Sequence, residues 1–182
     1  MKLEKYVPGQ LDRGRSTFVE ILWIITQGLF FSTWVPGSGL RVRLLRLFGA
    51  SIGIGVVIKP RVRVKFPWRI QVNNYSWIGE DVWIDNLAEV VIEESCCLSQ
   101  GAYICAGTHD WRRGDFSLIT KPIRIRRGSW IAAKAYVGPG VSIGTNVILA
   151  AGSVAVKDLE SNAIYSGNPA VLIKKVRESQ GS

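Results

Sequence analysis

The sequence predicts an all-β fold in which short parallel strands coil into a β-helix, with helices at the N-terminal end and a short helix at the C-terminal end. Two observations support this. An aliphatic residue or alanine returns every sixth position, at Ile125, Ile131, Val137, Ile143, Leu149 and Ala155. A small or branched residue follows four positions after each of the first five, at Ser129, Ala135, Val141, Val147 and Ser153. Each hexapeptide thus has two inward positions, and such a strand buries its apolar face only when the next coil stacks on it.

Length and composition limit the architecture and the partners. The chain has 182 residues, 47% hydrophobic and 20% charged, which suits one domain with a sizeable core. A net charge of +9 and a pI of about 9.8 favour anionic partners. We expect no nucleic-acid binding, because the sequence has no helix-turn-helix, zinc-finger or RNP-type pattern. Cys96, Cys97 and Cys105 form neither a CxxC pair nor an even disulfide framework, so we expect free thiols in a reducing cytosol.

Residues 1–50 predict a helical segment that covers one end of the β-helix. Thr17 with Glu20 three residues later matches a capping box, so we expect Thr17 to be the N-cap of a hydrophobic helix that runs to Trp34. This stretch falls just short of the roughly 18 apolar residues expected of a membrane span, it carries Glu20, and no cleavage motif follows it. We expect the helix to pack on the rest of the protein, and a position in a membrane interface is the alternative.

A second, basic helix is predicted from Leu40 to Phe48, in LRVRLLRLF, with leucines on one face and arginines interleaved. Because a β-helix exposes the interior of its terminal coil, we expect this helix to cap that end, to point its arginines at water and to end at Gly49. A weak contact with anionic membrane lipid is also expected. The arginines expected to make it are Arg13, Arg15, Arg41, Arg43 and Arg46.

Residues 51–158 are expected to form the β-helix domain. The inward positions begin at Ile52, Ile58, Val64 and Ile70, and two-residue slips move them to Val72, Ile78 and Ile84 and then to Ile92, Leu98 and Ile104. We expect each slip to be a corner bulge or a short loop. The partners four positions later are also expected in the core. They are Ser76, Val82, Ala88, Cys96, Ala102 and Thr108.

The period is lost at residues 110–122, which predicts a long irregular loop inside a regular scaffold, and such loops are usually functional. The loop follows His109, the only histidine of the chain. Residues 159–182 are expected to form a C-terminal tail with a short basic helix at residues 172–177.

Two segments carry a family resemblance. WIAAKAYVGPGVSIGTNVILAAGSVAVKD at residues 130–158, followed by SGNPA at residues 166–170, resembles the hexapeptide-repeat acyltransferases. Within them the chain is most similar to the colanic acid biosynthesis acetyltransferases, and next to the maltose and galactoside O-acetyltransferases. The resemblance implies a left-handed parallel β-helix with three hexapeptides per coil and a cytoplasmic homotrimer. It also implies acetyl transfer from acetyl-CoA to a sugar hydroxyl of a surface polysaccharide or its lipid-linked precursor.

The resemblance also supplies a catalytic candidate. His109, in GTHD, matches the catalytic histidine of the O-acetyltransferases, and imidazole is a suitable general base near neutral pH. Asp110 either orients the imidazole or caps the loop turn. Trp111 and Arg112 are expected to meet the acceptor sugar, and Trp111 is placed to stack on it.

Two further sites follow from the resemblance. Asp85 and Asn86, in WIDNLAEV, occur in the maltose-type enzymes and are expected to bind the acceptor; for Asn86 the alternative is a corner residue with left-handed backbone. Coenzyme A is expected in a groove between adjacent β-helices. The residues expected to line it are Trp130 and Ala133 at the pantetheine arm, Ala151 and Gly152 where the backbone approaches it, and Lys157, Lys174 and Lys175 at the phosphates.

Other functions remain open on this fold. An N-acyltransferase for an amino sugar nucleotide would depend less on a base, because a neutral amine is already nucleophilic. A zinc-dependent carbonic anhydrase needs three histidines, and the chain has one, so we expect no metal. A non-enzymatic scaffold would have lost the site, and the intact GTHD argues against that.

Overall fold

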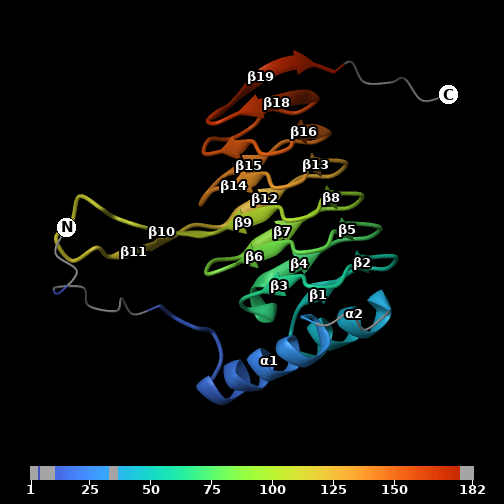
Figure 1. Ribbon diagram of the computed structural model, residues 1–182, viewed down its shortest axis with the longest axis vertical. Helices are drawn as coiled ribbons and strands as arrows, with labels where there is room; N and C mark the ends of the chain where they lie inside the picture. The colour runs from blue at the N-terminus through green and yellow to red at the C-terminus, as the bar shows by residue number, and fades with distance from the viewer. Residues whose placement is uncertain (1–3, 5–10, 33–36, 177–182) are drawn as a thin grey trace.

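The structure is a computed structural model that describes residues 4, 11–32 and 37–176. It shows a parallel β-helix whose strands form three faces, with two helices across one end (Figure 1). Face A contains β1 (Ser51–Ile52), β4 (Ile70–Val72), β7 (Val90–Ile92), β12 (Ile123–Ile125) and β15 (Ser142–Ile143). Face B contains β2 (Val57–Ile58), β5 (Trp77–Ile78), β8 (Cys97–Leu98), β13 (Trp130–Ile131), β16 (Val147–Leu149), β18 (Ala163–Gly167) and β19 (Ala170–Lys175). Face C contains β3 (Arg63–Val64), β6 (Trp83–Asp85), β9 (Tyr103–Cys105), β14 (Tyr136–Val137) and β17 (Val154–Ala155).

The strand pairing confirms the two predicted slips. Val57 pairs with Trp77, and Trp77 with Cys97, so each of these coils has 20 residues, two more than three hexapeptides. The extra residues lie at the corner between faces C and A. There the first coil makes the 3₁₀ turn η2 (Pro67–Arg69), and the second turns at Leu87, whose N–H donates to the Asp85 carbonyl at 3.0 Å. In the regular part Trp130 pairs with Ile148, which gives a coil of 18 residues.

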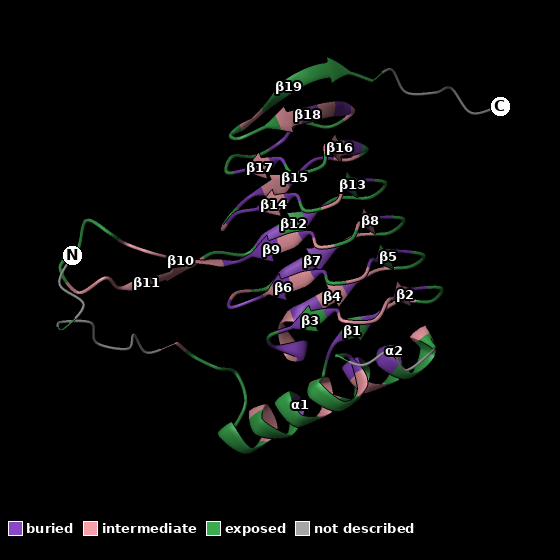
Figure 2. Cartoon of the chain, in the orientation of Figure 1, coloured by how far each residue is buried: buried purple, intermediate pink, exposed green. Residues whose placement is uncertain are grey.

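The predicted inward positions form one continuous core. Every residue of the predicted six-residue series, from Ile52 to Ile104 and from Ile125 to Ala155, is buried. Figure 2 shows buried chain along the whole axis of the β-helix. Two inward serine hydroxyls donate to carbonyls of the neighbouring coil, Ser76 to Glu93 at 2.8 Å and Ser129 to Gly144 at 2.7 Å. Both buried hydroxyls are therefore hydrogen-bonded. Two expectations differ from the structure: Ala88 is only partly buried, and Thr108 is exposed because the chain leaves the coil after Ala106.

Two helices cover the open end of the first coil. They are α1 (Thr17–Phe30) and α2 (Ser38–Leu47) (Figure 1). The N-cap of α1 is Ser16 and not Thr17, and no side chain caps it. The Glu20 carboxylate does not close a capping box because it binds Arg13 at 2.6 Å instead. The predicted end at Trp34 lies outside the described residues.

Helix α1 substitutes for the strand that the first coil lacks. The indole of Trp23 is fully buried, and its Nε1–H donates to the Val64 carbonyl at 2.8 Å. The Val64 N–H donates to Oε1 of Gln27 at 2.7 Å. Both backbone groups of this β3 residue are therefore satisfied by side chains of the helix. The corresponding residue of the next coil, Ile84, instead pairs with the preceding strand, since its carbonyl accepts the Lys65 N–H. Trp23 also meets Phe31 edge-on, with ring centroids 5.3 Å apart.

Helix α2 packs as a cap, but its arginines do not all face water. Val42 and Leu45 are buried, and so is Arg41, which donates to the Gly37 carbonyl at 3.2 Å. Arg46 donates to the carbonyls of Ile52 and Gly53. Gly49 ends the helix with a positive φ of 97°, as predicted.

The prediction of a C-terminal helix at residues 172–177 is wrong. Residues Ala170–Lys175 form β19, which pairs antiparallel with β18 (Figure 1). Strand β18 itself pairs in parallel with β16, so the coils continue past residue 158. Pairing with an available sheet edge outweighs the weak helix propensity of a short segment.

We expect Trp23→Ala to lower the free energy of unfolding by about 3–5 kcal/mol, because it leaves a cavity and removes a buried hydrogen bond. Urea titration followed by circular dichroism measures this. Ile24→Ala is the matched control, since Ile24 is exposed on the same helix and its loss should change stability by about 0.5 kcal/mol or less. Equal effects of the two changes would contradict the assignment of Trp23 as the anchor.

Candidate active site

The excursion from the β-helix is an ordered hairpin. Strands β10 (Gly107–His109) and β11 (Leu118–Thr120) pair antiparallel and project from the corner between β9 and β12 (Figure 1). The excursion therefore starts at Gly107, before the predicted loop, and includes His109. A side chain at residue 107 would come within 2.5 Å of the Leu87 Cδ1 atom, so glycine lets the hairpin base lie against the coil below.

The hairpin fixes the imidazole of His109. Its Nδ1 atom is 2.8 Å from the Phe116 carbonyl oxygen, and the two rings are stacked with centroids 4.3 Å apart. Because a carbonyl only accepts, this contact assigns the proton to Nδ1 and the basic lone pair to Nε2. A general base needs this tautomer. Nothing in the sequence pointed to Phe116, because the contact depends on how the hairpin folds back.

Asp110 caps the turn of the hairpin. Its Oδ1 atom accepts the Arg112 N–H at 3.1 Å, so of the two predicted roles the geometry matches the turn cap. Trp111 is exposed on the same turn, with the Arg112 guanidinium 6.0 Å from its ring centroid. Both side chains are exposed.

A hollow of about 340 Å³ lies beside the hairpin. Its lining residues are Leu11, Asp12, Arg69, Leu87, Ala88, Leu118 and Thr120. Register places His109 opposite Leu118, and alternation along a strand puts the side chains of His109, Leu118 and Thr120 on one face of the hairpin. His109 therefore shares the face that borders this hollow. Arg69 is held there by hydrogen bonds to the carbonyls of Leu87 and Asp12.

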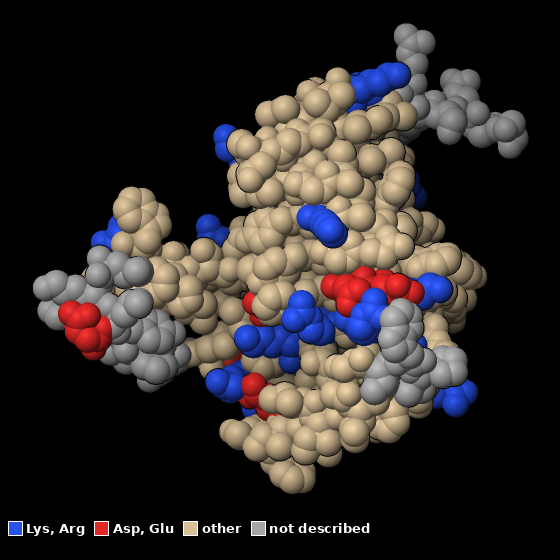
Figure 3. All heavy atoms as spheres, viewed as in Figure 1, with Lys and Arg blue, Asp and Glu red and all other residues tan. Residues whose placement is uncertain are grey.

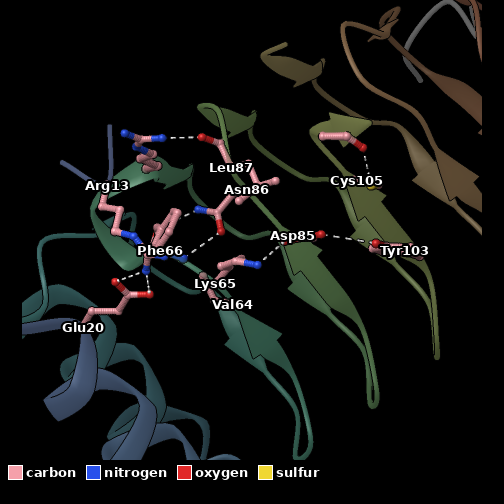
Figure 4. Close-up of polar contacts among 12 residues, drawn as sticks. Arg13, Glu20, Val64, Lys65, Phe66, Asp85, Asn86, Leu87, Tyr103 and Cys105 are labelled. Atoms are coloured by element: carbon pink, nitrogen blue, oxygen red, sulfur yellow. Dashed lines mark hydrogen bonds and ion pairs between the residues drawn. The ribbon is translucent and has the colours of Figure 1, made fainter. Parts of the chain in front are cut away.

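The predicted sugar contact by Asn86 is not what the structure shows. Asn86 is fully buried, its Oδ1 accepts the Phe66 N–H at 3.0 Å, and its Nδ2 donates to the Phe66 carbonyl at 2.6 Å (Figure 4). The amide completes the backbone pairing at the corner where the two-residue slip interrupts the ladder. Its backbone is not left-handed, so the alternative prediction of a corner residue with left-handed backbone is wrong as well.

Asp85 points outward and joins a polar chain on face C. The Tyr103 hydroxyl lies 3.3 Å from its Oδ2, and the Lys65 ammonium is 3.6 Å from its Oδ1 (Figure 4). Burial is the main cause that raises the pKa of Tyr103, and burial raises the pKa of Tyr136 to about 12, so both phenols stay protonated at neutral pH. Asp85 lies on β6, one coil before the hairpin, and the protonated Tyr103 hydroxyl is the hydrogen-bond donor beside it.

The candidate coenzyme residues occupy other parts of the surface. Trp130 is half-exposed on face B and donates to the Ser99 hydroxyl at 2.8 Å. Ala133 and Gly152 stack on the corner between faces B and C, where the Gly152 N–H donates to the Ala133 carbonyl at 2.9 Å. Gly152 has φ +68° and no atom within 4 Å of where a side chain would start, so this corner is open to a ligand.

The other predicted residues of this group are divided between two places. Ala151 is exposed beside Gly152, and Lys157 is exposed on the C–A corner, two coils beyond the hairpin. Lys174 and Lys175 lie on β19, where Lys175 binds Glu160 at 2.6 Å. One chain therefore does not bring His109 together with Ala133, Ala151 and Gly152, which lie on a different corner.

Among the described residues, no three His, Cys, Asp or Glu side chains are grouped so as to hold a metal ion. Within residues 11–32 and 37–176, no helix is long and apolar enough to cross a membrane.

Stacked hexapeptide coils of this kind define the hexapeptide-repeat transferases. The family model described as "Bacterial transferase hexapeptide (six repeats)" matches residues 122–155. The chain is 37% identical over 176 residues to the Escherichia coli (strain K12) protein named "Putative colanic acid biosynthesis acetyltransferase WcaF", covering 96% of each. The chain thus belongs to the hexapeptide-repeat acyltransferase family and is an acyltransferase.

More distant relatives agree on the fold. The galactoside O-acetyltransferase of E. coli (strain K12) is 23% identical, over 76% of this chain and 70% of that protein. The crystal structure of a Vibrio cholerae O1 biovar eltor hexapeptide-repeat acetyltransferase, VCA0836, complexed with acetyl coenzyme A superposes with a TM-score of 0.80. It is 23% identical and covers 91% of this chain and 92% of that one.

We expect Asn86→Ala to lower the free energy of unfolding by about 1–3 kcal/mol for each of the two Phe66 groups it strands. Thermal melting measures this, and the KM for an acceptor sugar should stay at the wild-type value. Asn74→Ala is the control, because the Asn74 Oδ1 accepts the exposed Ile54 N–H at 3.0 Å and its loss should cost about 1 kcal/mol or less. A raised KM with unchanged stability would restore Asn86 to the substrate site.

Proposed function

We propose that this chain is an acetyl-CoA-dependent O-acetyltransferase that acetylates a sugar hydroxyl in surface polysaccharide biosynthesis, with His109 as the general base. The observation that carries the proposal is the contact of His109 Nδ1 with the Phe116 carbonyl, which leaves Nε2 as the basic nitrogen. The likeness to the protein named for colanic acid biosynthesis supports the substrate class, a colanic-acid-like exopolysaccharide.

In the proposed reaction, Nε2 of His109 takes the hydroxyl proton as the sugar oxygen attacks the thioester carbonyl. The carbonyl becomes an oxyanion, and its collapse breaks the carbon–sulfur bond. The imidazolium then gives its proton to the departing thiolate, so the sugar ester and the free thiol of coenzyme A are formed. The Phe116 carbonyl oxygen stabilises the imidazolium between these two steps, because its partial negative charge faces Nδ1–H.

The acceptor is proposed to lie against the hairpin. Trp111 offers an exposed ring for stacking on a sugar, Arg112 a cation, and Asp85 a carboxylate one coil below. An N-acyltransferase of Bacillus cereus, AntD, solved with dTDP-4-amino-4,6-dideoxyglucose and coenzyme A, has a related fold, with a TM-score of 0.63 at 20% identity. Acetyl transfer to a panel of neutral sugars, saccharide lipids and amino sugar nucleotides distinguishes the two acceptor classes. The proposal requires an ester product.

We further propose that the active unit is a cytoplasmic homotrimer. Its support is the division of the site, since the hairpin and the open Ala133–Gly152 corner are separated by the width of face C. A second copy supplies the missing half, with Trp130 and Ala151 beside the pantetheine arm and Lys174 near the phosphates. Lys157 lies on the same corner as the hairpin and is proposed to reach the phosphates from the copy that carries His109. All three cysteines are free, which agrees with a reducing compartment.

We expect His109→Ala to lower kcat by about 10²- to 10⁴-fold, the usual contribution of a general base, with little change in acetyl-CoA affinity. Steady-state kinetics and calorimetry measure the two quantities. Thr108→Ala is the matched control, because Thr108 is exposed on the opposite face of the same strand, and it should retain near wild-type kcat. A His109→Ala enzyme with near wild-type kcat would remove the histidine from the mechanism.

We expect a mass three times the chain mass of 20.1 kDa in light scattering at micromolar concentration. If each active site combines the His109 hairpin of one copy with the Ala133–Gly152 corner of its neighbour, co-expressed His109→Ala and Ala151→Trp chains should regain about a quarter of wild-type activity. In randomly mixed trimers, about a quarter of the interfaces bring an intact hairpin to an intact corner. Each variant alone should be nearly inactive. A fully active monomer, or no regain in a mixed trimer, would contradict a shared site.

A further inference from the structure

Helix α1 presents its most apolar side away from the protein. Trp23 and Gln27 face the β-helix. At 100° per residue, the opposite side carries an apolar stripe about 100° wide. Its members are Phe18, Ile21, Leu22, Ile25 and Leu29, each between 45% and 75% exposed. Figure 2 shows α1 largely exposed at the end of the molecule. Burying a large apolar side chain is normally favourable, so a stripe of five calls for a partner.

The stripe continues onto the second helix. Val19 and Leu22 of α1 line a hollow of about 410 Å³ together with Leu47 and Phe48 at the end of α2. Leu47 is 78% exposed, the highest value among the large apolar residues of the described chain. We call the combined surface the cap face; it comprises Phe18, Ile21, Leu22, Ile25, Leu29 and Leu47.

The charges at the edge of the cap face are cationic. Arg15 lines the same hollow, and Arg43 is exposed on α2 one turn before Leu47. Residues 11–52 contain two carboxylates, and both are engaged: Glu20 binds Arg13 at 2.6 Å, and Asp12 lies 3.6 Å from Arg69. In Figure 3 the end of the molecule formed by α1 shows hardly any charged side chains.

We propose that the cap face docks on an anionic lipid surface, with α1 lying in the plane of the interface. An exposed apolar stripe edged by arginines matches acyl chains below and anionic headgroups beside it. A second copy is a poorer partner, because cap faces in contact would bring Arg15 and Arg43 of both copies together. A helix of 14 residues is about 21 Å long, too short for the roughly 30 Å hydrocarbon core.

This inference differs from the contact expected from the sequence. That expectation relied on five arginines, but Arg41 is buried, Arg13 binds Glu20, and Arg46 binds backbone carbonyls. The apolar side chains of α1 therefore supply the larger share of the contact, and Arg15 and Arg43 supply the preference for negative charge. The inference is independent of the catalytic proposal, since the cap face lies at the end of the β-helix, away from the hairpin (Figure 1).

The test is co-sedimentation with vesicles of phosphatidylglycerol and phosphatidylcholine, and with phosphatidylcholine alone. We expect wild-type protein to bind the anionic vesicles more tightly, and Ile21→Glu/Ile25→Glu to lower that binding at least tenfold. The matched control is Val171→Glu/Ile173→Glu, which places the same charges on exposed residues of β19 at the opposite end of the molecule. It should bind like wild type. Both variants should keep the wild-type melting temperature and activity on a water-soluble acceptor.

Three results would overturn the inference. They are a wild-type protein that binds neither kind of vesicle, a double variant of α1 that binds as tightly as wild type, and a double variant whose mass in light scattering falls below that of wild type. The last would show that a second copy covers the cap face. If the wild-type protein showed no activity on any soluble acceptor, that result would count against the proposed function and would leave the vesicle result unaffected.

Discussion

Parallel coils bury nothing until they are stacked, and this constraint acts at both ends of the molecule. At the first coil, Trp23 and Gln27 satisfy the backbone of Val64 as a strand of a preceding coil would. At the last coil, β18 continues face B and β19 closes it by turning antiparallel. The interior between them is a stack of aliphatic rows with inward serines bonded to the neighbouring coil. The helical cap is therefore part of the core and not an appendage.

Much of the fold could be predicted because a six-residue period is a local signal repeated many times. Both slips were visible as shifts of two residues in that period. The failures concern positions where the local signal is weak and a distant partner decides. A short helix is predicted at residues 172–177, yet the edge of β18 is available and β19, which ends at Lys175, pairs with it. Arg41 is charged and is expected to face water, yet it is buried on the face of α2 that covers the first coil.

The candidate site shows the same division. His109 could be found because it is the only histidine and precedes the break in the period. Its orientation could not, since the Phe116 carbonyl reaches it only after the hairpin closes. The sequence predicts a sugar contact for Asn86 because its neighbourhood resembles a binding motif, whereas in the structure its amide pairs with the backbone of Phe66. Residues whose roles depend on a corner, or on a second chain, are the ones that sequence spacing does not resolve.

The two ends of the stack are chemically different, and this difference limits how the protein assembles end to end. Helix α1 covers the strand edge at one end of the stack, whereas β19 is the outermost strand of face B at the other end. An edge of this kind pairs with an identical edge, which joins two molecules and then leaves no edge for a third. Lys174 and Lys175 place positive charge along that strand and oppose even this pairing. A scaffold made of stacked strands thus avoids growing into filaments.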